Sequence, residues 1–280
     1  AILKSGVRVH TAHLKSVLRI PTYRELLFPL NIRKIPADPK EAARELAKSN
    51  LLELLHKAHK AEDSFYFRLG MQSKKTIEQR SAFIKRCSFA LEQETGGKLK
   101  NSPSGYELEI RLAENQEGQF VPFVKLFTFG KDRFSYRKYT VASSIRPEQA
   151  ALIVRLAKPY MQEQAQVLDP FCGVGTMLIE RERICPAKVM YGVDIFGEAI
   201  AKAKENTKLA GREIYYINRD FYEFTHKYAF DEIITDMPER GKKSKDEQDA
   251  LYAAFFDKAD EVLTDKGRII MYSNEKNFVK

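Results

Sequence analysis

Residues 165–180, Ala-Gln-Val-Leu-Asp-Pro-Phe-Cys-Gly-Val-Gly-Thr-Met-Leu-Ile-Glu, constrain the fold of this chain more than any other stretch. The run starts as a short apolar strand ending at Asp169, turns through Gly173 and Gly175, and opens into an apolar helix. In an α/β sheet, this order of strand, glycine turn and helix builds a ligand site at the carboxyl end of a strand. Glycines let the backbone approach a ligand, and the helix N-terminus offers N–H groups to it.

Two common nucleotide sites do not match this stretch. A dinucleotide fingerprint needs a third glycine where Leu178 stands, and a phosphate loop needs Lys where Thr176 follows Gly175. The run Asp-Pro-Phe-Cys-Gly-Val-Gly-Thr resembles instead the first motif of S-adenosylmethionine-dependent methyltransferases, in the form found in RNA amino-methylases. The resemblance implies a Rossmann-like doubly wound α/β domain with S-adenosylmethionine as cofactor. It places the cofactor against Asp169, Phe171, Cys172, Gly173, Gly175 and Thr176.

The chain beyond this motif is predicted to alternate strands and helices, with strands at 188–194, 213–217, 231–236 and 268–272. Asp194 ends the second strand of this domain, where a carboxylate can accept hydrogen bonds from the ribose hydroxyls of the cofactor. Asp220 follows the third strand and is placed to accept from the adenine amine, with Phe221 against the ring. Either acid could instead be a helix cap.

Residues 235–240, Thr-Asp-Met-Pro-Glu-Arg, resemble the Asp/Asn-Pro-Pro-Tyr motif of methylases that act on exocyclic amines. The resemblance implies that Asp236 and the backbone near Met237 and Pro238 hold the target –NH2 and direct its lone pair. Methyl transfer from a sulfonium depends chiefly on placement and needs no metal. One departure is Glu239, which stands where the family has an aromatic that stacks on the base, a contact worth about 1–3 kcal/mol. Tyr272 or Tyr136 could replace that aromatic, or the chain has lost activity and kept RNA binding.

Charge divides the chain unevenly. The net charge is +9, and residues 1–147 carry 27 Lys/Arg against 15 Asp/Glu, whereas residues 148–280 carry 20 against 23. A basic part joined to a near-neutral part indicates that one binds a polyanion while the other does chemistry. In residues 131–146, Lys and Arg alternate with aromatic residues. This pattern suits a segment that binds phosphates and unpaired nucleobases, and it also suits an ordinary basic linker strand. The candidate RNA contacts there are Arg133, Tyr136, Arg137 and Lys138.

The region before the predicted methyltransferase domain resembles the THUMP module, a small α/β RNA-binding domain of tRNA- and rRNA-modifying enzymes. The matching pieces are the strand residues 65–68, the helix that follows them, the turn Asn101-Ser102-Pro103 and the strand residues 107–111. The expected architecture is therefore a smaller α+β THUMP-like region preceding the methyltransferase domain. The predicted boundaries are an N-terminal α/β region at 1–61, the THUMP-like domain at 62–134, a linker at 135–146 and the methyltransferase domain at 147–280. Only seven residues follow Ser273, so the sheet is short or the chain is cut before its last strands.

The sequence favours an RNA methyltransferase that modifies guanine N2 in a structured tRNA or rRNA. Guanine and adenine both remain open, as do a catalytically inactive RNA-binding protein and a DNA adenine-N6 methylase. The three cysteines have no paired spacing, which fits a reducing cytoplasm and not a disulfide frame or a zinc site. No stretch is apolar and long enough to span a membrane. The sequence is silent on oligomeric state.

Overall fold

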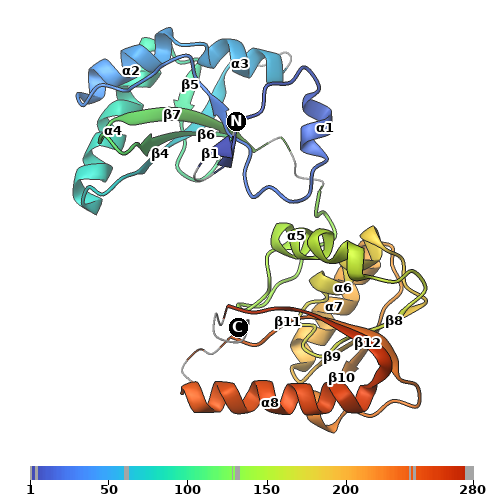
Figure 1. Cartoon of the computed structure of the whole chain (residues 1–280). Coiled ribbons are helices and arrows are strands. Elements are labelled where there is room, and N and C mark those ends of the chain that lie inside the picture. Colours follow the sequence, from blue (N-terminus) through green and yellow to red (C-terminus); the bar gives the residue numbers. More distant parts are fainter. Residues whose placement is uncertain are drawn as a thin grey trace. The chain divides into compact units, whose positions relative to one another are not determined.

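The computed structural model describes residues 2–3, 6–59, 63–127, 129, 133–239, 241 and 244–274. The chain forms two compact units (Figure 1). The smaller unit is residues 23–131, and the larger unit joins residues 1–22 to residues 132–280.

The larger unit holds a five-stranded sheet in which every neighbouring pair of strands is parallel, in the order β10-β9-β8-β11-β12. Because the order reverses between β8 and β11, the crevice at their carboxyl ends is where such a sheet binds its ligand. The predicted strands are present with shifted ends, and the last one starts earlier than predicted. The strands are β8 (Gln166–Asp169), β9 (Val189–Asp194), β10 (Tyr215–Asn218), β11 (Phe230–Asp236) and β12 (Leu263–Tyr272).

Helices cover both faces of this sheet, which makes it a doubly wound α/β fold (Figure 1). Successive strand residues point to opposite faces, so Val167 packs with α5, α6 and α7 while Leu168 packs with α8. The helices are α5 (Pro147–Ala157), α6 (Thr176–Ile184), α7 (Gly197–Leu209) and α8 (Lys245–Val262), with short 3-10 turns η1 (Lys158–Tyr160) and η2 (Phe221–Glu223).

Residues 1–22 contribute an antiparallel pair, β1 (Ile2–Leu3) and β2 (Gly6–Val7), and a short helix, α1 (Leu14–Leu18). Arg133 Nη1 donates to the carbonyl oxygen of Ile20 at 3.1 Å, which connects this segment to the start of the larger unit's main part.

The smaller unit has a mixed five-stranded sheet in the order β3-β7-β6-β4-β5. Alternate residues of β4 are buried beneath the helices, which together bury one face of the sheet in a single apolar core. The strands are β3 (Phe28–Pro29), β4 (Phe65–Gln72), β5 (Leu99–Asn101), β6 (Leu108–Glu114) and β7 (Phe120–Leu126). The helices are α2 (Pro39–Lys48), α3 (Leu51–Ala58) and α4 (Ile77–Glu94).

One predicted boundary falls inside this unit. Leu46 of α2 and Leu55 of α3 are fully buried in the same core as Phe67 of β4, so residues 39–58 do not form a region separate from the strands that follow. Residues 1–22 group instead with the larger unit. The spacing of apolar residues indicates helices but carries no information on which sheet they cover.

Within the part of the chain that the structure describes, no helix combines the length and the apolar character needed to cross a membrane.

Candidate active site

Three aspartates end neighbouring strands of the larger sheet. Asp169, Asp194 and Asp236 close β8, β9 and β11. The strands are parallel and adjacent, so their carboxyl ends meet at one edge of the sheet, on either side of the point where the strand order reverses. The structure therefore brings together acids that lie far apart in the sequence.

The glycine turn after β8 is tied to the end of β9 by Asp194. Asp194 Oδ2 accepts the N–H of Gly173 at 2.8 Å, and Oδ1 accepts the N–H of Phe196 at 2.9 Å. Gly173 has φ +52° with open space where a side chain would begin. Gly175 has φ +80°, and an added Cβ would lie 2.2 Å from the Tyr216 hydroxyl. Gly175 is therefore required by both backbone conformation and packing, whereas Gly173 leaves the turn open.

Asp169 is the most buried of the three acids, at 1% exposure. Its Oδ1 accepts the hydroxyl of Thr235 at 2.7 Å and the N–H of Phe171 at 3.2 Å. Burial raises the pKa of Asp169 to about 8, and the negative charges of Asp236 and Asp194 act in the same direction. No cation among the described residues compensates this acid. The hydrogen bond between Thr235 and Asp169 links β11 to β8 near the carboxyl ends of both strands.

Asp236 presents a half-buried carboxylate for which the described residues supply no hydrogen-bond donor. Burial raises the pKa of Asp236 to about 6, and the nearby charge of Glu239 adds to the effect. The carboxylate is therefore ionised at neutral pH and keeps its full capacity to accept hydrogen bonds.

The loop after Asp236 is held at two points. Met237 is 3% exposed, and its N–H donates to the carbonyl oxygen of Tyr272 at 2.9 Å. The side-chain amide of Gln248 on α8 donates to the carbonyl oxygen of Pro238 at 3.3 Å. These contacts fix the backbone of the loop that follows Asp236.

Glu239 is exposed and belongs to a short polar chain at the edge of this loop. Asn274 Nδ2 donates to Glu239 Oε1 at 2.8 Å, and the Tyr272 hydroxyl donates to Asn274 Oδ1 at 3.0 Å. Tyr272 lies beside Asp236 in the register of β11 and β12. Of the two aromatics suggested as substitutes for the missing stacking residue, Tyr272 is the one near the loop. Arg240 lies outside the described residues.

The remaining predicted cofactor residues have mixed environments. Asp220 Oδ1 accepts the N–H of Tyr222 at 2.9 Å, which caps η2 and leaves its other oxygen without a described donor. Phe221 is 2% exposed and packs edge-on against Phe171, with ring centroids 5.7 Å apart. Two others are buried within the turn: Cys172, a free thiol whose pKa burial raises, and Thr176, whose Oγ1 accepts from Arg137 Nε at 3.2 Å.

The basic stretch at 133–138 has largely internal contacts. The Tyr136 hydroxyl donates to Glu180 Oε1 at 2.8 Å, and its ring is 5% exposed, so it is not available to stack on a base. Arg137 Nη2 donates to the carbonyl oxygen of Ile145 at 2.6 Å, and burial lowers the pKa of this guanidinium. Lys138 remains exposed. The alternation of basic and aromatic residues in the sequence did not distinguish side chains that face the sheet from those that face solvent.

Sequence reasoning gave no role to three residues that support the site: Thr235, Gln248 and Asn274. Gln248 carried a usable signal, because it precedes buried Tyr252 and Phe255 at helical spacing on the apolar stripe of α8. A polar residue on such a stripe indicates a specific hydrogen bond.

The family of RMKL-like methyltransferase domains (UPF0020) matches residues 135–280. The chain belongs to this family. The match covers the parallel sheet, the glycine turn and the Asp236 loop. The family is one of methyltransferase domains, residues 135–280 form its Rossmann-like domain, and the cofactor of that domain is S-adenosylmethionine.

Two sequence relatives are similar to this part of the chain. One is the release factor glutamine methyltransferase of Bacillus cereus, 28% identical over 163 residues, covering 50% of this chain and 56% of the relative. The other is the tRNA (guanine(10)-N2)-dimethyltransferase of Methanothermobacter thermautotrophicus, 27% identical over 161 residues, covering 55% of this chain and 47% of the relative. The chain spans about half the length of these relatives.

Solved structures resemble a larger share of the chain. TrmN from Thermus thermophilus matches with a TM-score of 0.57 at 21% identity, covering 84% of this chain and 68% of that one. SMU.472, a putative methyltransferase complexed with SAH, matches with a TM-score of 0.65 at 13% identity, covering 95% and 80%. At these identities the likeness establishes the fold.

The residues at the strand ends fit S-adenosylmethionine. The open position at Gly173 leaves room beside the turn. Each Asp194 oxygen accepts one backbone N–H, and a carboxylate oxygen accepts up to two hydrogen bonds, so capacity remains for ribose hydroxyls. Asp220 retains one oxygen of the same kind.

Proposed function

We propose that this protein methylates an exocyclic base amine in a structured RNA, a tRNA or an rRNA, with guanine N2 as the target. The observation that carries the proposal is the Asp236 carboxylate, an ionised acceptor without a described donor at the carboxyl end of β11, followed by a loop anchored through Met237 and Pro238. An amine donates two hydrogen bonds, and this site offers acceptors to receive them.

When bound, S-adenosylmethionine supplies an electrophilic methyl group on a sulfonium centre. The chain's own residues do the placing. Asp194 and Asp220 would hold the nucleoside part, and Asp236 with the backbone after it would hold the amine so that its lone pair faces the methyl. The nitrogen must lose a proton on methylation, and an Asp236 Oδ atom would accept it. A base enclosed in a duplex must leave its stack to reach such a site.

RNA is favoured over other amine or amide substrates by charge. The excess of Lys and Arg over residues 1–147 suits a polyanion, and it adjoins the methyltransferase sheet in sequence. The relative named as a tRNA (guanine(10)-N2)-dimethyltransferase supports tRNA guanine as the first substrate to test. Three free cysteines suit a reducing cytoplasm as the place of action.

The test is methyl transfer from labelled S-adenosylmethionine to unfractionated tRNA and rRNA, followed by digestion and identification of the labelled nucleoside. We expect N2-methylguanosine from the wild type. Asp236→Ala should lower the rate by about 10²–10³-fold, the usual cost of removing a group that orients or stabilises the reacting centre. Calorimetry should show unchanged affinity of that variant for S-adenosylmethionine.

Label in N6-methyladenosine would move the target to adenine, and label in DNA alone would contradict the RNA assignment. No transfer to any nucleic acid by well-folded protein that binds S-adenosylmethionine would contradict the proposed activity. That result would favour an RNA-binding protein in which Glu239 replaces the stacking aromatic.

A further inference from the structure

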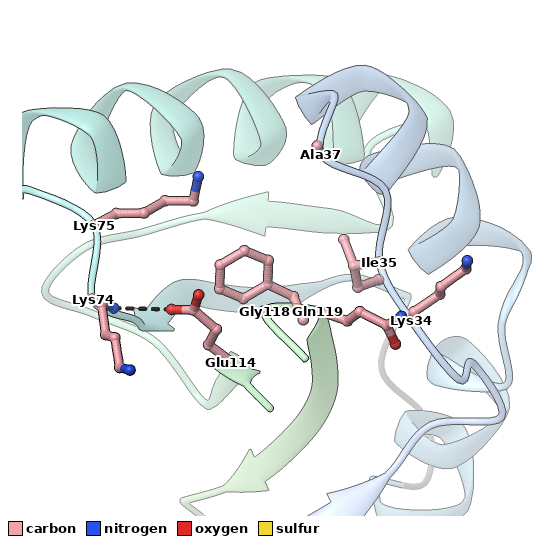
Figure 2. Close-up of a pocket in the computed structure, with 9 residues that line it drawn as sticks. Lys34, Ile35, Ala37, Lys74, Lys75, Glu114, Gly118 and Gln119 are labelled. Atoms are coloured by element: carbon pink, nitrogen blue, oxygen red, sulfur yellow. Dashed lines mark hydrogen bonds between the residues drawn. The ribbon is translucent and has the colours of Figure 1, made fainter. Parts of the chain in front are cut away.

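The smaller unit contains a pocket of about 470 Å³ (Figure 2). Its walls come from the loop before α2, the turn between β4 and α4, and the hairpin between β6 and β7. Lys74 and Lys75 lie on one side of the pocket and Lys34 on the other, with Glu114 between the turn and the hairpin (Figure 2).

Backbone contacts hold the walls in place. The N–H of Ile35 donates to the carbonyl oxygen of Phe120 at 2.7 Å, and both side chains are buried in the core of the unit. The N–H of Lys74 donates to Glu114 Oε2 at 2.9 Å, which fastens the turn to the end of β6. The pocket is therefore preformed, and its size is that of sites that take small ligands or single nucleotides.

Charge at the pocket differs from charge on the sheet face opposite the helices. On that face Arg68, Arg111 and Lys125 are paired with carboxylates. By contrast, Lys34, Lys74 and Lys75 are exposed, and the described residues bring no carboxylate within ion-pair distance of their ammonium groups. Uncompensated ammonium groups on two opposite sides of a pocket (Figure 2) suit the successive phosphates of a nucleic acid.

Glu114 adds a requirement of its own. Its Oε2 binds the Lys74 N–H, and no described donor reaches Oε1. A carboxylate within a basic pocket repels any phosphate placed next to it, but it accepts a hydrogen bond from a hydroxyl. In a nucleic acid, the hydroxyl next to the backbone phosphates is the ribose 2′-OH, which DNA lacks.

We propose that this pocket binds one ribonucleotide of the substrate RNA, with the backbone phosphate on one side of it at Lys74 and Lys75, the phosphate on its other side at Lys34, and the 2′-hydroxyl on Glu114. The inference rests on the proposed RNA substrate and deepens it, because it assigns the choice of RNA over DNA to a site on the smaller unit.

The lysines are tested by the salt dependence of RNA binding. The variant Lys34→Ala/Lys74→Ala/Lys75→Ala is compared with Lys48→Ala/Lys57→Ala/Lys85→Ala, which removes the same charge from exposed positions outside the pocket. The probe is a fluorescent single-stranded RNA, followed by anisotropy between 50 and 200 mM salt, about the range over which phosphate contacts are resolved. Each lost phosphate contact lowers the slope of log affinity against log salt by about 0.7, so the pocket variant should lose up to about 2.

Equal slopes for the two triple variants would overturn the assignment of the lysines. Circular dichroism and affinity for S-adenosylmethionine establish that both variants are folded.

Glu114 is tested by comparing RNA and DNA of one sequence. Gln at position 114 retains an acceptor for the Lys74 N–H but loses the charge. Glu114→Gln should therefore strengthen DNA binding and lower the RNA-to-DNA affinity ratio by about tenfold, the worth of one charge-assisted hydrogen bond. The matched control is Glu117→Gln, in the same hairpin and outside the pocket, which should leave the ratio unchanged. A wild-type ratio in Glu114→Gln would overturn the role given to the carboxylate.

The pocket and the proposed activity fail separately. If the wild type methylates RNA but the pocket variants bind it normally, the pocket assignment is wrong and the activity stands. If RNA binding depends on the pocket but no methyl transfer occurs, the pocket stands and the activity is wrong.

Discussion

The buried acids of the smaller unit and the acids at the strand ends of the larger unit have opposite electrostatic environments. In the smaller unit, Glu109 is 4% exposed and receives hydrogen bonds from both Arg68 and Arg111, and its pKa is lowered. Arg111 also binds Glu25, whose pKa falls to about 2. At the strand ends of the larger unit, Asp169 has no cation to offset its burial, and its pKa rises to about 8.

This difference in pairing distinguishes the acids that support the fold from the acids at the candidate site. The larger unit compensates acids away from its crevice, since the buried Glu232 is paired with Arg181, with Nε and Oε1 2.9 Å apart. At the carboxyl ends of β8 and β11, by contrast, Asp169 and Asp236 have no ion pair with a cation of the described residues. Buried acids without a nearby cation lower the stability of the fold, and such acids cluster at sites that bind a ligand. Opposite pKa shifts predict opposite responses to mutation and to pH.

The largest effect is expected from removing the shared cation of the smaller unit. Arg111→Met leaves Glu109 buried and half of its compensation gone, and it removes the principal partner of Glu25. Breaking a buried pair in this way costs about 3 kcal/mol. Hydrogen exchange of the β4 and β6 amides measures the loss in this unit alone.

The control for Arg111 is an exposed ion pair of the same unit. Arg44 and Glu94 lie 3.0 Å apart with side chains 57% and 38% exposed, so Arg44→Met should cost less than about 1 kcal/mol. An equal loss of unfolding free energy in the two variants would mean that Arg111 does not compensate the buried Glu109 more than an exposed ion pair would.

A smaller effect, of the opposite sign, is expected at Asp169. Its folded pKa of about 8 exceeds the ordinary value of 3.8, so between these pH values the unfolded chain has released a proton that the folded chain retains. Wild-type stability therefore falls as pH rises through this window. Asp169→Asn keeps an acceptor oxygen and removes the titrating carboxyl. Its free energy of unfolding should therefore rise relative to that of the wild type as pH rises, by at least about 1 kcal/mol at pH 8.

Thermal unfolding of Asp169→Asn and wild type across pH 4 to 9, roughly spanning the two pKa values, measures this gain. The exposed Asp249→Asn serves as control and should follow the wild type. A constant difference between Asp169→Asn and wild type at all pH values would mean that the carboxyl is not titrating in this window.

The smallest effect concerns Glu239. Its charge helps to raise the pKa of Asp236 to about 6, after burial. Glu239→Gln keeps an oxygen for Asn274 and removes the charge, so the pKa of Asp236 should fall by less than about one unit. In the proposed reaction Asp236 accepts the amine in its ionised form, so the acid limb of the kcat/KM profile for methyl transfer should move to lower pH. An unchanged or upward-shifted limb would contradict the coupling of the two acids.

Local sequence was enough to predict the two motifs of the site. Residues 165–180 specify a strand, a turn and a helix because their apolar run, glycines and second apolar run each act over a few positions. The strand before Asp236 is predicted equally well, since a short apolar run bounded by polar residues has few other uses in an α/β chain. Asp169, Asp194 and Asp236 were predicted to lie together because ligand sites of doubly wound sheets lie at strand ends, and the structure places them at the ends of neighbouring strands.

Contacts between distant segments were beyond the reach of the sequence. The hydrogen bonds from Thr235 to Asp169 and from Gln248 to Pro238 depend on which strands and helices become neighbours. Burial of Tyr136 against Glu180 likewise depends on packing between residues 44 positions apart. Alternation indicates that two faces exist, but it does not say which face is covered.

By itself, the sequence determined the glycine turn after β8, the aspartates at the strand ends and the loop in which Glu239 stands where the resembling motif has an aromatic. Tertiary structure alone decided which charges are compensated. An arginine neutralises an acid only within a few ångströms, and in this fold Arg111 reaches Glu25 across 86 positions while Asp169 is left with a hydroxyl and a backbone N–H. The pKa values of the site follow from that arrangement.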